Sequence, residues 1–458
     1  MLPLNRFLFP QAEDAFRLVS LAEPGLTADR VKQRALALAT KMQGQPSGAW
    51  VLWSENPLSF LCGLLALWQL GSPAVLIPNC KPDTLNLALQ GAVGLLSDEP
   101  ALQPRQLLDF APAPCELIPA KEVPLEQTAV IVFTSGSTGQ PKPIPKRLAQ
   151  LHSEIAGLER EFGAGMGQRP LLATLGHSHL YGLLFRLLWP LCASRLIPGQ
   201  NLLIPEEVKD LAPCTLASSP TFLSLLAQSP VVRDLSHLRL IFSSGGALAE
   251  EPCQMLLAKG ANEVVEIFGS SETGGVAQRR NRQGQPRNEV WQPLRGVQVR
   301  AGQESRMQVL SPFAQFDPNA GWLDTQDLIQ CLPSGEFAFQ GRGDRIAKIG
   351  EKRIALKAVE DKICEHTLVS SAVVLATDHL PGKKQGRLAA VVEWQGEFPL
   401  SPPQRRQAAS EIRALLAARF EEIAFPKYWR FVSSIERNPV GKPEFAALLQ
   451  LFAAEDNS

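Results

Sequence analysis

Short apolar runs alternate with longer amphipathic stretches along the first two-thirds of the chain. Residues 129–135, 238–244 and 263–268 are apolar and rich in β-branched side chains, which is typical of buried strands. Residues 147–162 and 248–259 have the spacing of helices that are apolar on one face. This alternation predicts an α/β fold in which helices cover the faces of a sheet.

The pattern changes at about residue 289. From there to residue 340 the chain consists of short strands and turns, which predicts a β-rich subdomain. Mixed units return in the tail, with a helix near 404–420. The glycines of "GRGDR" predict a flexible joint, so we expect a large domain of layered sheets and helices over residues 1–342 and a small, mobile α+β domain over residues 343–458. A chain of 458 residues supports this division, because one core stops growing at roughly 250–300 residues.

One uncharged stretch, from Pro57 to Cys80, is long enough to cross a bilayer. The tripeptide "GSP" at 71–73 interrupts it, so we favour a buried helix to about Leu70 followed by a buried strand, "AVLIP". Arg6 and the acidic residues after it interrupt the apolar N-terminus, and no signal peptide is expected.

Charge and cysteine content narrow the class of protein. The 45 basic and 45 acidic residues cancel, which argues against nucleic acid or an anionic membrane as the main partner. The eight cysteines form no CxxC pair, which indicates thiols in a reducing compartment and therefore a cytoplasmic protein. The six histidines show no metal-binding spacing.

The segment "TSGSTGQPKP" has the composition of a phosphate-binding loop and follows a predicted strand. Gly136 and Gly139 let the backbone approach an anion, and Lys142 supplies positive charge. The hydroxyl donors are Ser135, Ser137 and Thr138. The spacing is not that of a Walker A loop, GxxxxGK[ST]. Taken alone, the segment is equally compatible with a Ser/Gly-rich surface loop.

One candidate carboxylate lies in a segment that follows a predicted strand, and another follows a predicted turn. In "FGSSETGG", Glu272 offers a hard oxygen ligand for Mg²⁺, or belongs to a capping-type turn. At the end of "GWLDTQD", Asp327 is able to accept both vicinal hydroxyls of a ribose, or is a solvated surface residue.

Two basic segments lie further along. "FQGRGDRIAKIGEKRI" contains Arg342, Asp344, Arg345 and Lys348, and its structural alternative is a charged hairpin. "NPVGKPEF" places Lys442 on a tight glycine turn, which in isolation is typical of a surface turn.

Together and in this order, these segments resemble the adenylate-forming superfamily of acyl-CoA synthetases, nonribosomal-synthetase adenylation domains and luciferases. The resemblance runs from about residue 51 to the "GKPE" turn. It implies an acid–thiol ligase: ATP and Mg²⁺ convert a small carboxylic acid into an acyl-adenylate with release of pyrophosphate. The acyl group then passes to the thiol of coenzyme A or of the phosphopantetheine arm of an acyl carrier protein.

The resemblance also implies a role for each matching residue. Lys442 reaches the carboxylate and the α-phosphate, and Lys348 belongs to the loop that serves the thiol step after rotation about Asp344. Glu272 and Thr138 hold Mg²⁺, and His179 and Gly182 lie near the acyl pocket. ATP is bound by Thr134, Ser135, Gly136, Ser137, Thr138, Gly139, Lys142, Gly245, Gly246, Ala247, Phe268, Gly269, Ser271, Asp327 and Arg342.

The chain departs from the common family sequence at a few positions. Phe268 replaces Tyr, Ser271 replaces Thr, and "PIPKRLAQL" follows Lys142 in place of the usual "GV..TH". The last variant resembles ligases of aryl-polyene and xanthomonadin-type pigment clusters, which implies an aryl or unsaturated acid loaded onto a carrier protein.

Two other classes share this framework: a luciferase-like oxygenase that acts on an acyl-adenylate, and a non-catalytic nucleotide-binding protein. The joint presence of Glu272, Asp327, Arg342 and Lys442 argues against the second, because a degenerate copy is free to lose them.

Overall fold

The structure is a computed structural model. It describes residues 1–8, 27–99, 102, 116–135, 141–197, 202–285, 287–314, 321–342, 346–350, 352–377, 380, 386–436 and 445–453. The chain divides into two compact units, each considered by itself below: 1–80, 85–133 and 143–343 form the larger, and 81–84, 134–142 and 344–458 form the smaller.

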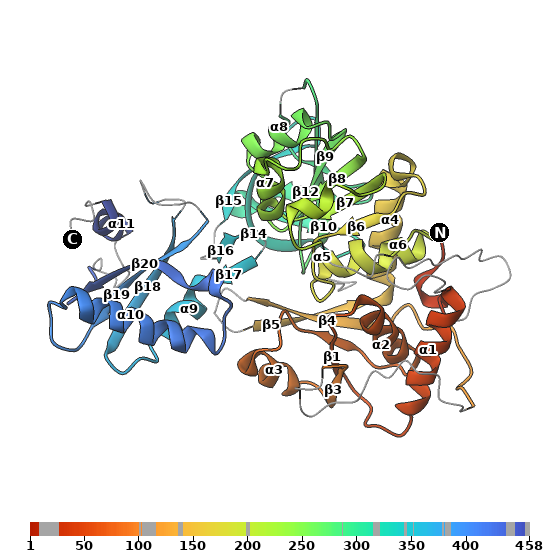
Figure 1. Ribbon diagram of the computed structural model, residues 1–458, viewed down its shortest axis with the longest axis horizontal. Coiled ribbons are helices and arrows are strands. Elements are labelled where there is room, and N and C mark those ends of the chain that lie inside the picture. The colour runs from red at the N-terminus through yellow and green to blue at the C-terminus, as the bar shows by residue number, and fades with distance from the viewer. Residues whose placement is uncertain are drawn as a thin grey trace. The chain divides into compact units, whose positions relative to one another are not determined.

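A five-stranded sheet contains the first strands of the chain, in the order β3-β1-β2-β4-β5 (Figure 1). Its strands are β1 (Trp50–Trp53), β2 (Ala74–Leu76), β3 (Gly94–Ser97), β4 (Thr128–Ser135) and β5 (Pro141–Arg147). β1 pairs in parallel with β2 and β3, and β2 pairs in parallel with β4. Their carboxyl ends therefore lie at one edge of the sheet.

Helix α2 (Pro57–Gln69) is buried along its whole length, as its apolar sequence predicts. The Asn56 side chain accepts hydrogen bonds from the backbone N–H groups of Leu58 and Ser59 at 2.9 and 3.2 Å and so caps the helix. The chain then turns at Gly71 and enters β2. The predicted buried helix and strand are thus confirmed, and none of the helices in the described residues is long and apolar enough to span a membrane.

Two more helices cover this sheet. Helix α1 (Ala28–Lys41) shares a core with α2 and with residues such as Leu52 and Leu76 on one sheet face. Helix α3 (Pro82–Leu89) contributes Leu85 to a second cluster on the opposite face.

A six-stranded sheet follows, in the order β11-β10-β9-β8-β7-β6. Its strands are β6 (Leu171–Ala173), β7 (Cys214–Ser218), β8 (Leu238–Ser243), β9 (Glu263–Ser270), β10 (Gly274–Arg282) and β11 (Gln292–Pro293). The run from β6 to β9 is parallel, whereas β10 pairs with β9 and β11 in antiparallel fashion. Alternate residues pack on opposite faces, as Ile241 and Phe242 illustrate by joining different cores.

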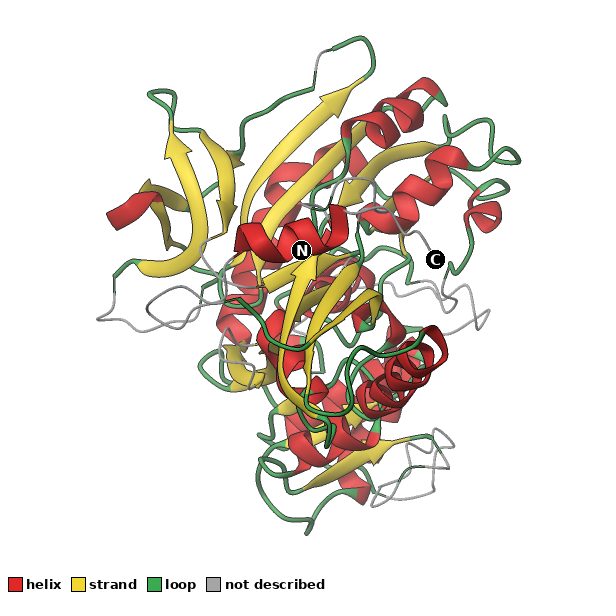
Figure 2. Cartoon of the chain, turned by 90° about the vertical axis from the view of Figure 1, so that its left-hand side faces the viewer, coloured by secondary structure: helices red, strands yellow, loops and turns green. Residues whose placement is uncertain are grey.

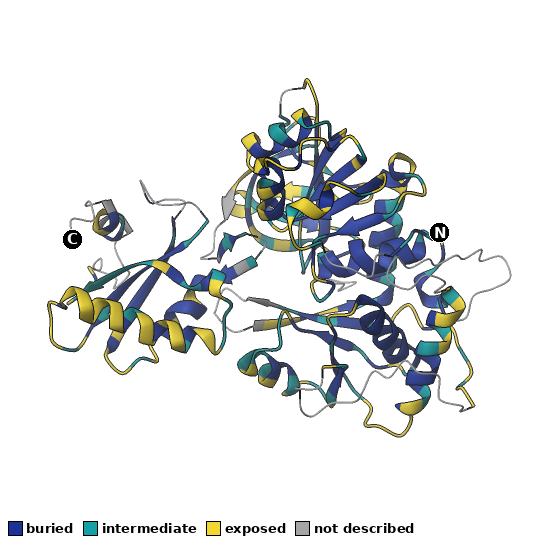
Figure 3. Cartoon of the chain, in the orientation of Figure 1, coloured by how far each residue is buried: buried dark blue, intermediate teal, exposed yellow. Residues whose placement is uncertain are grey.

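Helices α7 (Pro220–Gln228) and α8 (Glu250–Ala258) cover one face of this sheet. The other face packs on α4 (Leu148–Met166) and on the segment α5 (Leu180–Gly182), η2 (Leu183–Leu188) and α6 (Trp189–Cys192), of which η2 is a π-helical turn. Phe242 of β8 contacts Phe162 of α4 at a ring distance of 5.0 Å. In Figure 3 the strands and the covering faces of the helices are buried.

The β-rich part of the larger unit is a four-stranded antiparallel sheet, in the order β12-β13-β14-β15. Its strands are β12 (Gln298–Ala301), β13 (Arg306–Leu310), β14 (Leu323–Cys331) and β15 (Phe337–Arg342). The short 3₁₀ turns of the chain are η1 (Leu4–Arg6), η3 (Pro205–Val208), η4 (Gln303–Ser305) and η6 (Glu422–Ala424).

The smaller unit has its own sheets and cores. Figure 2 distinguishes the helices and strands of the whole chain by colour. The smaller unit contains the hairpin β16 (Ile346–Ile349) and β17 (Lys352–Ala355), the sheet β18 (Val369–Ala376), β19 (Leu388–Trp394) and β20 (Pro426–Val432), and the helices α9 (Leu356–Ile363), α10 (Pro402–Ala417) and α11 (Phe445–Ala453). Helices α9 and α10 pack on one face of the three-stranded sheet, and α11 packs on the other. The predicted α/β class with a β-rich part and an α+β tail is confirmed.

Candidate active site

Several predicted site residues follow the carboxyl ends of parallel strands in the six-stranded sheet. His179 and Gly182 follow β6, the loop Gly245–Ala247 follows β8, and Phe268 and Glu272 lie at the end of β9 and in the turn after it. Because these strands are parallel and adjacent, the three segments emerge at one edge. Ligands of open α/β sheets bind at this edge.

The turn that carries Glu272 is closed by its own side chains. Ser270 N donates to Thr273 Oγ1 at 3.0 Å, and Thr273 N donates to Ser270 Oγ at 3.2 Å. Gly269 lies directly against the returning strand, where a Cβ would come within 2.3 Å of the Gly274 carbonyl oxygen. The glycine is therefore required for the tight approach that fixes the Glu272 turn.

A buried lysine forms a hydrogen bond with the backbone of this turn. Lys146, only 1% exposed, donates to the carbonyl oxygens of Glu272 at 3.0 Å and Phe313 at 2.8 Å. Burial lowers the pKa of Lys146 to about 8, against the opposing effect of the Glu154 and Glu272 carboxylates. Glu154 in turn accepts a hydrogen bond from Gly275 N at 2.7 Å, so α4 and β10 hold the turn from two sides.

The Gly245–Ala247 loop is attached to the edge of β9. Gly245 has a φ of +89°, which a residue with a side chain adopts at a cost. Ser244 Oγ donates to the Ile267 carbonyl oxygen at 2.8 Å, and Leu248 N donates to Glu266 Oε2 at 3.1 Å. The loop is thus held at both ends beside the strand that carries Phe268.

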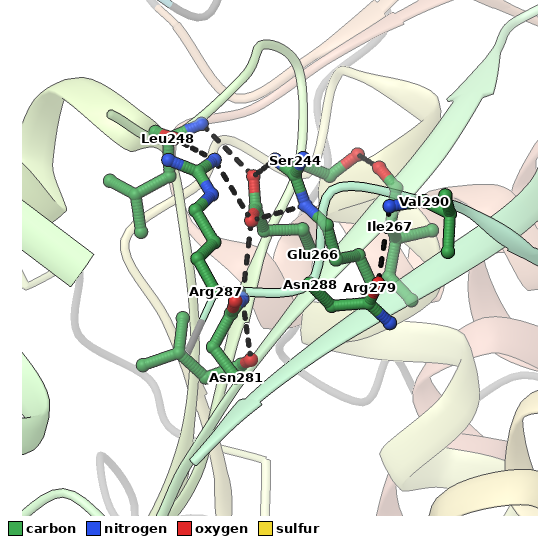
Figure 4. A network of polar contacts seen from close by, with 10 residues as sticks. Ser244, Leu248, Glu266, Ile267, Arg279, Asn281, Arg287, Asn288 and Val290 are labelled. Atoms are coloured by element: carbon green, nitrogen blue, oxygen red, sulfur yellow. Dashed lines mark hydrogen bonds and ion pairs between the residues drawn. The ribbon is translucent and has the colours of Figure 1, made fainter. Parts of the chain in front are cut away.

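Glu266 is the centre of a buried ionic network beneath this loop (Figure 4). Its carboxylate accepts two hydrogen bonds from Arg279, Nε at 2.9 Å and a terminal nitrogen at 2.7 Å. Asn281 Nδ2 donates to the same carboxylate at 3.2 Å. Arg287 lies 3.4 Å from it and donates to the Leu248 carbonyl oxygen at 2.6 Å. The network therefore fixes both the loop and the strand.

Phe268 lies in an aromatic cluster. Its ring centroid is 5.3 Å from Trp291, 5.8 Å from Phe337 and 5.6 Å from Phe339. The Arg279 guanidinium lies 4.5 Å from the Trp291 centroid, which links this cluster to the ionic network.

Asp327 reaches the same region through the four-stranded sheet. It is 6% exposed, and its strand β14 pairs with β15, which carries two of the aromatic residues in contact with Phe268. In the register of these strands Asp327 lies opposite Arg342. Asp327 lies in the middle of β14, and its backbone N–H donates to Thr325 Oγ1 at 3.2 Å.

The segment after β6 leaves no room for a side chain at Gly182, one of the predicted site positions. His179 is exposed and begins helix α5, whose residue Gly182 faces the Gly176 carbonyl. A Cβ on Gly182 would lie 2.0 Å from that oxygen. His177 Nε2 bonds the Ser54 carbonyl oxygen, which follows β1, at 2.7 Å. The carboxyl edges of the two parallel sheets therefore meet here.

The phosphate side of the predicted site is described only in part. Gly136, Ser137, Thr138, Gly139, Asp344 and Lys442 lie outside the described residues. For Thr134, Ser135 and Arg342 the strand backbone is described without the side chains. Lys142 is exposed on β5, and Lys348 lies on β16 opposite Arg353. The roles assigned to all these residues stay predictions.

The chemistry of the described edge fits magnesium. Glu272 supplies a carboxylate on a rigid turn, and the described residues contain no cluster of three or more His, Cys, Asp or Glu able to cage a metal. Mg²⁺ usually takes one or two carboxylates and completes its shell with water and substrate phosphates. A single protein carboxylate is therefore sufficient at a nucleotide site.

The supporting residues were absent from the predicted site. Lys146 lies in the segment that the sequence marked only as variant, Glu154 lies in the predicted helix 147–162, and Glu266 lies within a strand otherwise rich in apolar residues. An acidic residue in such a strand was the available signal, because buried carboxylates require a partner.

Comparison with known proteins identifies the family. Residues 23–313 match the family "AMP-binding enzyme". The chain is 31% identical to 4-coumarate–CoA ligase of Rhodobacter capsulatus over 316 residues, covering 64% of this chain and 74% of that protein. It is 26% identical to sulfoacetate–CoA ligase of Cupriavidus necator (70% and 66% covered) and 25% identical to a linear gramicidin synthase of Brevibacillus parabrevis (93% and 6% covered).

Solved structures share the fold. The amide bond synthetase McbA of Marinactinospora thermotolerans superposes with a TM-score of 0.78 at 20% identity, covering 99% of this chain and 100% of that one. A malonyl-CoA ligase bound to methylmalonyl-CoA and AMP gives a TM-score of 0.78 at 23% identity, covering 95% and 100%.

The chain spans 6% of the gramicidin synthase and about two thirds of the sulfoacetate ligase. The family match covers well over half of the chain and includes the Glu272 turn and the Gly245–Ala247 loop. The resemblance noted from the sequence is confirmed, and the chain belongs to the AMP-binding enzyme family of the adenylate-forming superfamily.

Proposed function

We propose that the protein is an AMP-forming acid–thiol ligase. It uses ATP to convert a carboxylic acid into an acyl-adenylate, releases pyrophosphate, and passes the acyl group to the thiol of coenzyme A or of a carrier-bound phosphopantetheine. The observation that carries the proposal is the family match together with Glu272 on its fixed turn beside the Gly245–Ala247 loop.

The first step requires positioning of ATP. The Gly245–Ala247 backbone and Phe268 would enclose the adenine, and Asp327 would accept hydrogen bonds from the ribose hydroxyls, with Arg342 beside it. Glu272 and Thr138 would hold Mg²⁺, which supplies charge neutralisation at the phosphates. Buried donors and rigid turns hold this edge in place before the substrate arrives, which lowers the reorganisation that the transition state needs.

The acid attacks the α-phosphate, and the β- and γ-phosphates leave as pyrophosphate. The cradle Thr134–Gly139 with Lys142 would bind the leaving phosphates. Lys442 would neutralise charge that develops between the carboxylate and the α-phosphate. For the second step, rotation about Asp344 would exchange Lys442 for the loop that carries Lys348, because two successive transition states need different surroundings.

Relatives are consistent with this class but differ in their acids. One is named for 4-coumarate, an aryl acid, and another for sulfoacetate. The resemblance of the "PIPKRLAQL" variant to pigment-cluster ligases implies an aryl or unsaturated acid, with a carrier protein as the acceptor. The deciding experiment is a pyrophosphate-release screen over aryl, cinnamoyl and fatty acids, followed by thioester formation with either thiol. Absence of acid-dependent pyrophosphate release from the whole panel would contradict the proposal.

Replacement of Lys442 separates the two half-reactions. Lys442→Ala should reduce pyrophosphate release by roughly 10²–10³-fold, the usual effect of removing one preorganised charge. The same variant, given synthetic acyl-AMP and thiol, should form thioester at nearly the wild-type rate. Equal loss of both steps in a folded variant would refute the two-conformation mechanism, and normal adenylation would make Lys442 a turn residue only.

A further inference from the structure

Arg186 is a fully buried arginine with no hydrogen-bond partner among the described residues. Its side chain is 0% exposed, and none of its three guanidinium nitrogens forms a hydrogen bond with any part of the chain that the structure describes. Burial lowers its pKa to about 10, so the group is still positively charged at neutral pH. An isolated buried charge is strongly unfavourable unless an anion neutralises it.

Other buried cations of the same unit are satisfied. Arg195, 2% exposed, forms two hydrogen bonds with the Glu159 carboxylate, at 2.6 and 2.9 Å, and one with the Gly167 carbonyl oxygen at 3.0 Å. Lys146 bonds two carbonyl oxygens, and Arg279 forms a bidentate pair with Glu266. Arg186 is therefore distinct among these four groups, and packing alone does not account for its charge.

Arg186 lies on the segment that follows the carboxyl end of β6. It belongs to the π-helical turn η2, a few residues after His179 and Gly182, and π-helical turns are frequent at functional sites. Burial lowers the pKa of His177 to about 4, and the positive charge of Arg186 adds to this effect. His177 contacts Phe60 and bonds the Ser54 carbonyl oxygen, at the junction of the two sheet edges.

Two neighbouring polar atoms on the same segment are also buried without partners in the described chain: His177 Nδ1 and the Tyr181 hydroxyl. Because Nε2 of His177 donates to a carbonyl oxygen and the ring is neutral at pH 7, Nδ1 carries a lone pair that accepts a hydrogen bond. Asp98 is a nearby carboxylate, since it accepts a hydrogen bond from Ser54 Oγ at 2.8 Å. It forms no hydrogen bond with Arg186 among the described contacts.

We propose that Arg186 binds a second anionic group of the acid substrate, so that the enzyme prefers acids carrying a carboxylate or sulfonate besides the carboxylate that is adenylated. This inference rests on the proposed function, because it assigns the distal end of the acyl site. Guanidinium binds carboxylate and sulfonate oxygens in bidentate geometry. A neutral tail would leave the buried charge unneutralised, which disfavours its binding.

The test uses acids matched in shape. Terephthalate and 4-sulfobenzoate are compared with 4-methylbenzoate, and adipate is compared with its monomethyl ester, by kcat/KM for pyrophosphate release. Wild type should favour the dianionic member of a pair by about 10²-fold or more, since loss of one partner of a buried charge pair has effects of this size. Comparison of terephthalate with 4-sulfobenzoate shows whether a carboxylate or a sulfonate is preferred.

Arg186→Met should remove this preference, lowering kcat/KM for the dianionic acid by about 10²-fold while the neutral-tailed acid changes by less than about 3-fold. Arg186→Lys should retain part of the preference. Arg195→Met is the matched control: it breaks a satisfied buried pair, so it should lower the melting temperature and leave the preference unchanged. Arg186→Met should not lower the melting temperature comparably, since it removes a buried charge that no described residue neutralises.

Binding without catalysis separates this inference from the proposed function. Dianionic acids should raise the melting temperature of wild type, but not of Arg186→Met, in the absence of ATP. If no acid supports pyrophosphate release, the ligase assignment fails. The change in melting temperature on binding of dianionic acids still tests the role of Arg186 in that case. The inference is overturned if wild type treats both members of each pair alike, or if Arg186→Met weakens both equally. Should Arg186→Met not fold, the wild-type preference and Arg186→Lys decide the matter.

Discussion

At the scale of single residues, Glu266 connects several parts of the described site. Its carboxylate neutralises Arg279 and Arg287 and positions the Gly245–Ala247 loop through Leu248 N. Glu266→Gln should lower the free energy of unfolding by about 3–5 kcal/mol, because it leaves buried arginine charge uncompensated. Urea-induced unfolding measures the loss, and the variant should also bind ATP more weakly.

The matched control is Glu126→Gln. Glu126 accepts a hydrogen bond from Arg147 at 2.9 Å, and both side chains are exposed, at 76% and 38%. Its loss should cost less than about 1 kcal/mol, since solvent screens such pairs. If both variants lose equal stability, burial of the Glu266 network is not what makes it important.

At the scale of elements, the junction between β6 and α5 depends on one glycine. Gly182 has helical φ and ψ values of −64° and −39°, so alanine is compatible with its backbone. A Cβ there would nonetheless lie 2.0 Å from the Gly176 carbonyl oxygen and 2.7 Å from its carbon. Gly182→Ala should therefore cost about 1–3 kcal/mol or more and displace the segment that begins at His179.

Gly165→Ala provides the comparison, because Gly165 is also helical and its nearest neighbour to a new Cβ is Leu240 at 3.7 Å. That change should be neutral or stabilise the protein by up to about 1 kcal/mol. Thermal unfolding of the two variants and acid-dependent pyrophosphate release provide the readouts. Equal stability of both variants would show that the segment relaxes without cost.

At the scale of the whole molecule, the hydrophobic cores fall into two separate sets. Among the described residues, three clusters lie within 2–337, and two lie within 347–452. Calorimetry should show two unfolding transitions, because each set forms its own cooperative unit. A fragment of residues 1–342 should keep the transition of the larger unit. A single transition, lost on truncation, would contradict this expectation.

Much of the fold followed from local patterns. Residues 263–268 were predicted as a strand and form β9 (Glu263–Ser270), and the uncharged stretch after Pro57 was predicted as a buried helix and forms α2. Such elements are predictable because apolar periodicity and turn residues act over a few positions. The hairpin β16–β17 corresponds to the structural alternative weighed for its charged segment.

The sequence by itself determined the family, the α/β class and the order of the motifs, because glycines, hydroxyls and charged residues at fixed spacing are local properties of the chain. Only the tertiary structure decided which groups support them. Lys146 forms a hydrogen bond with the carbonyl oxygen of Glu272, which is 126 residues away in the sequence. His177 likewise bonds the carbonyl oxygen of Ser54, 123 residues away. Arg186 is flanked by apolar residues, but whether a charge has a partner depends on what the folded chain brings beside it.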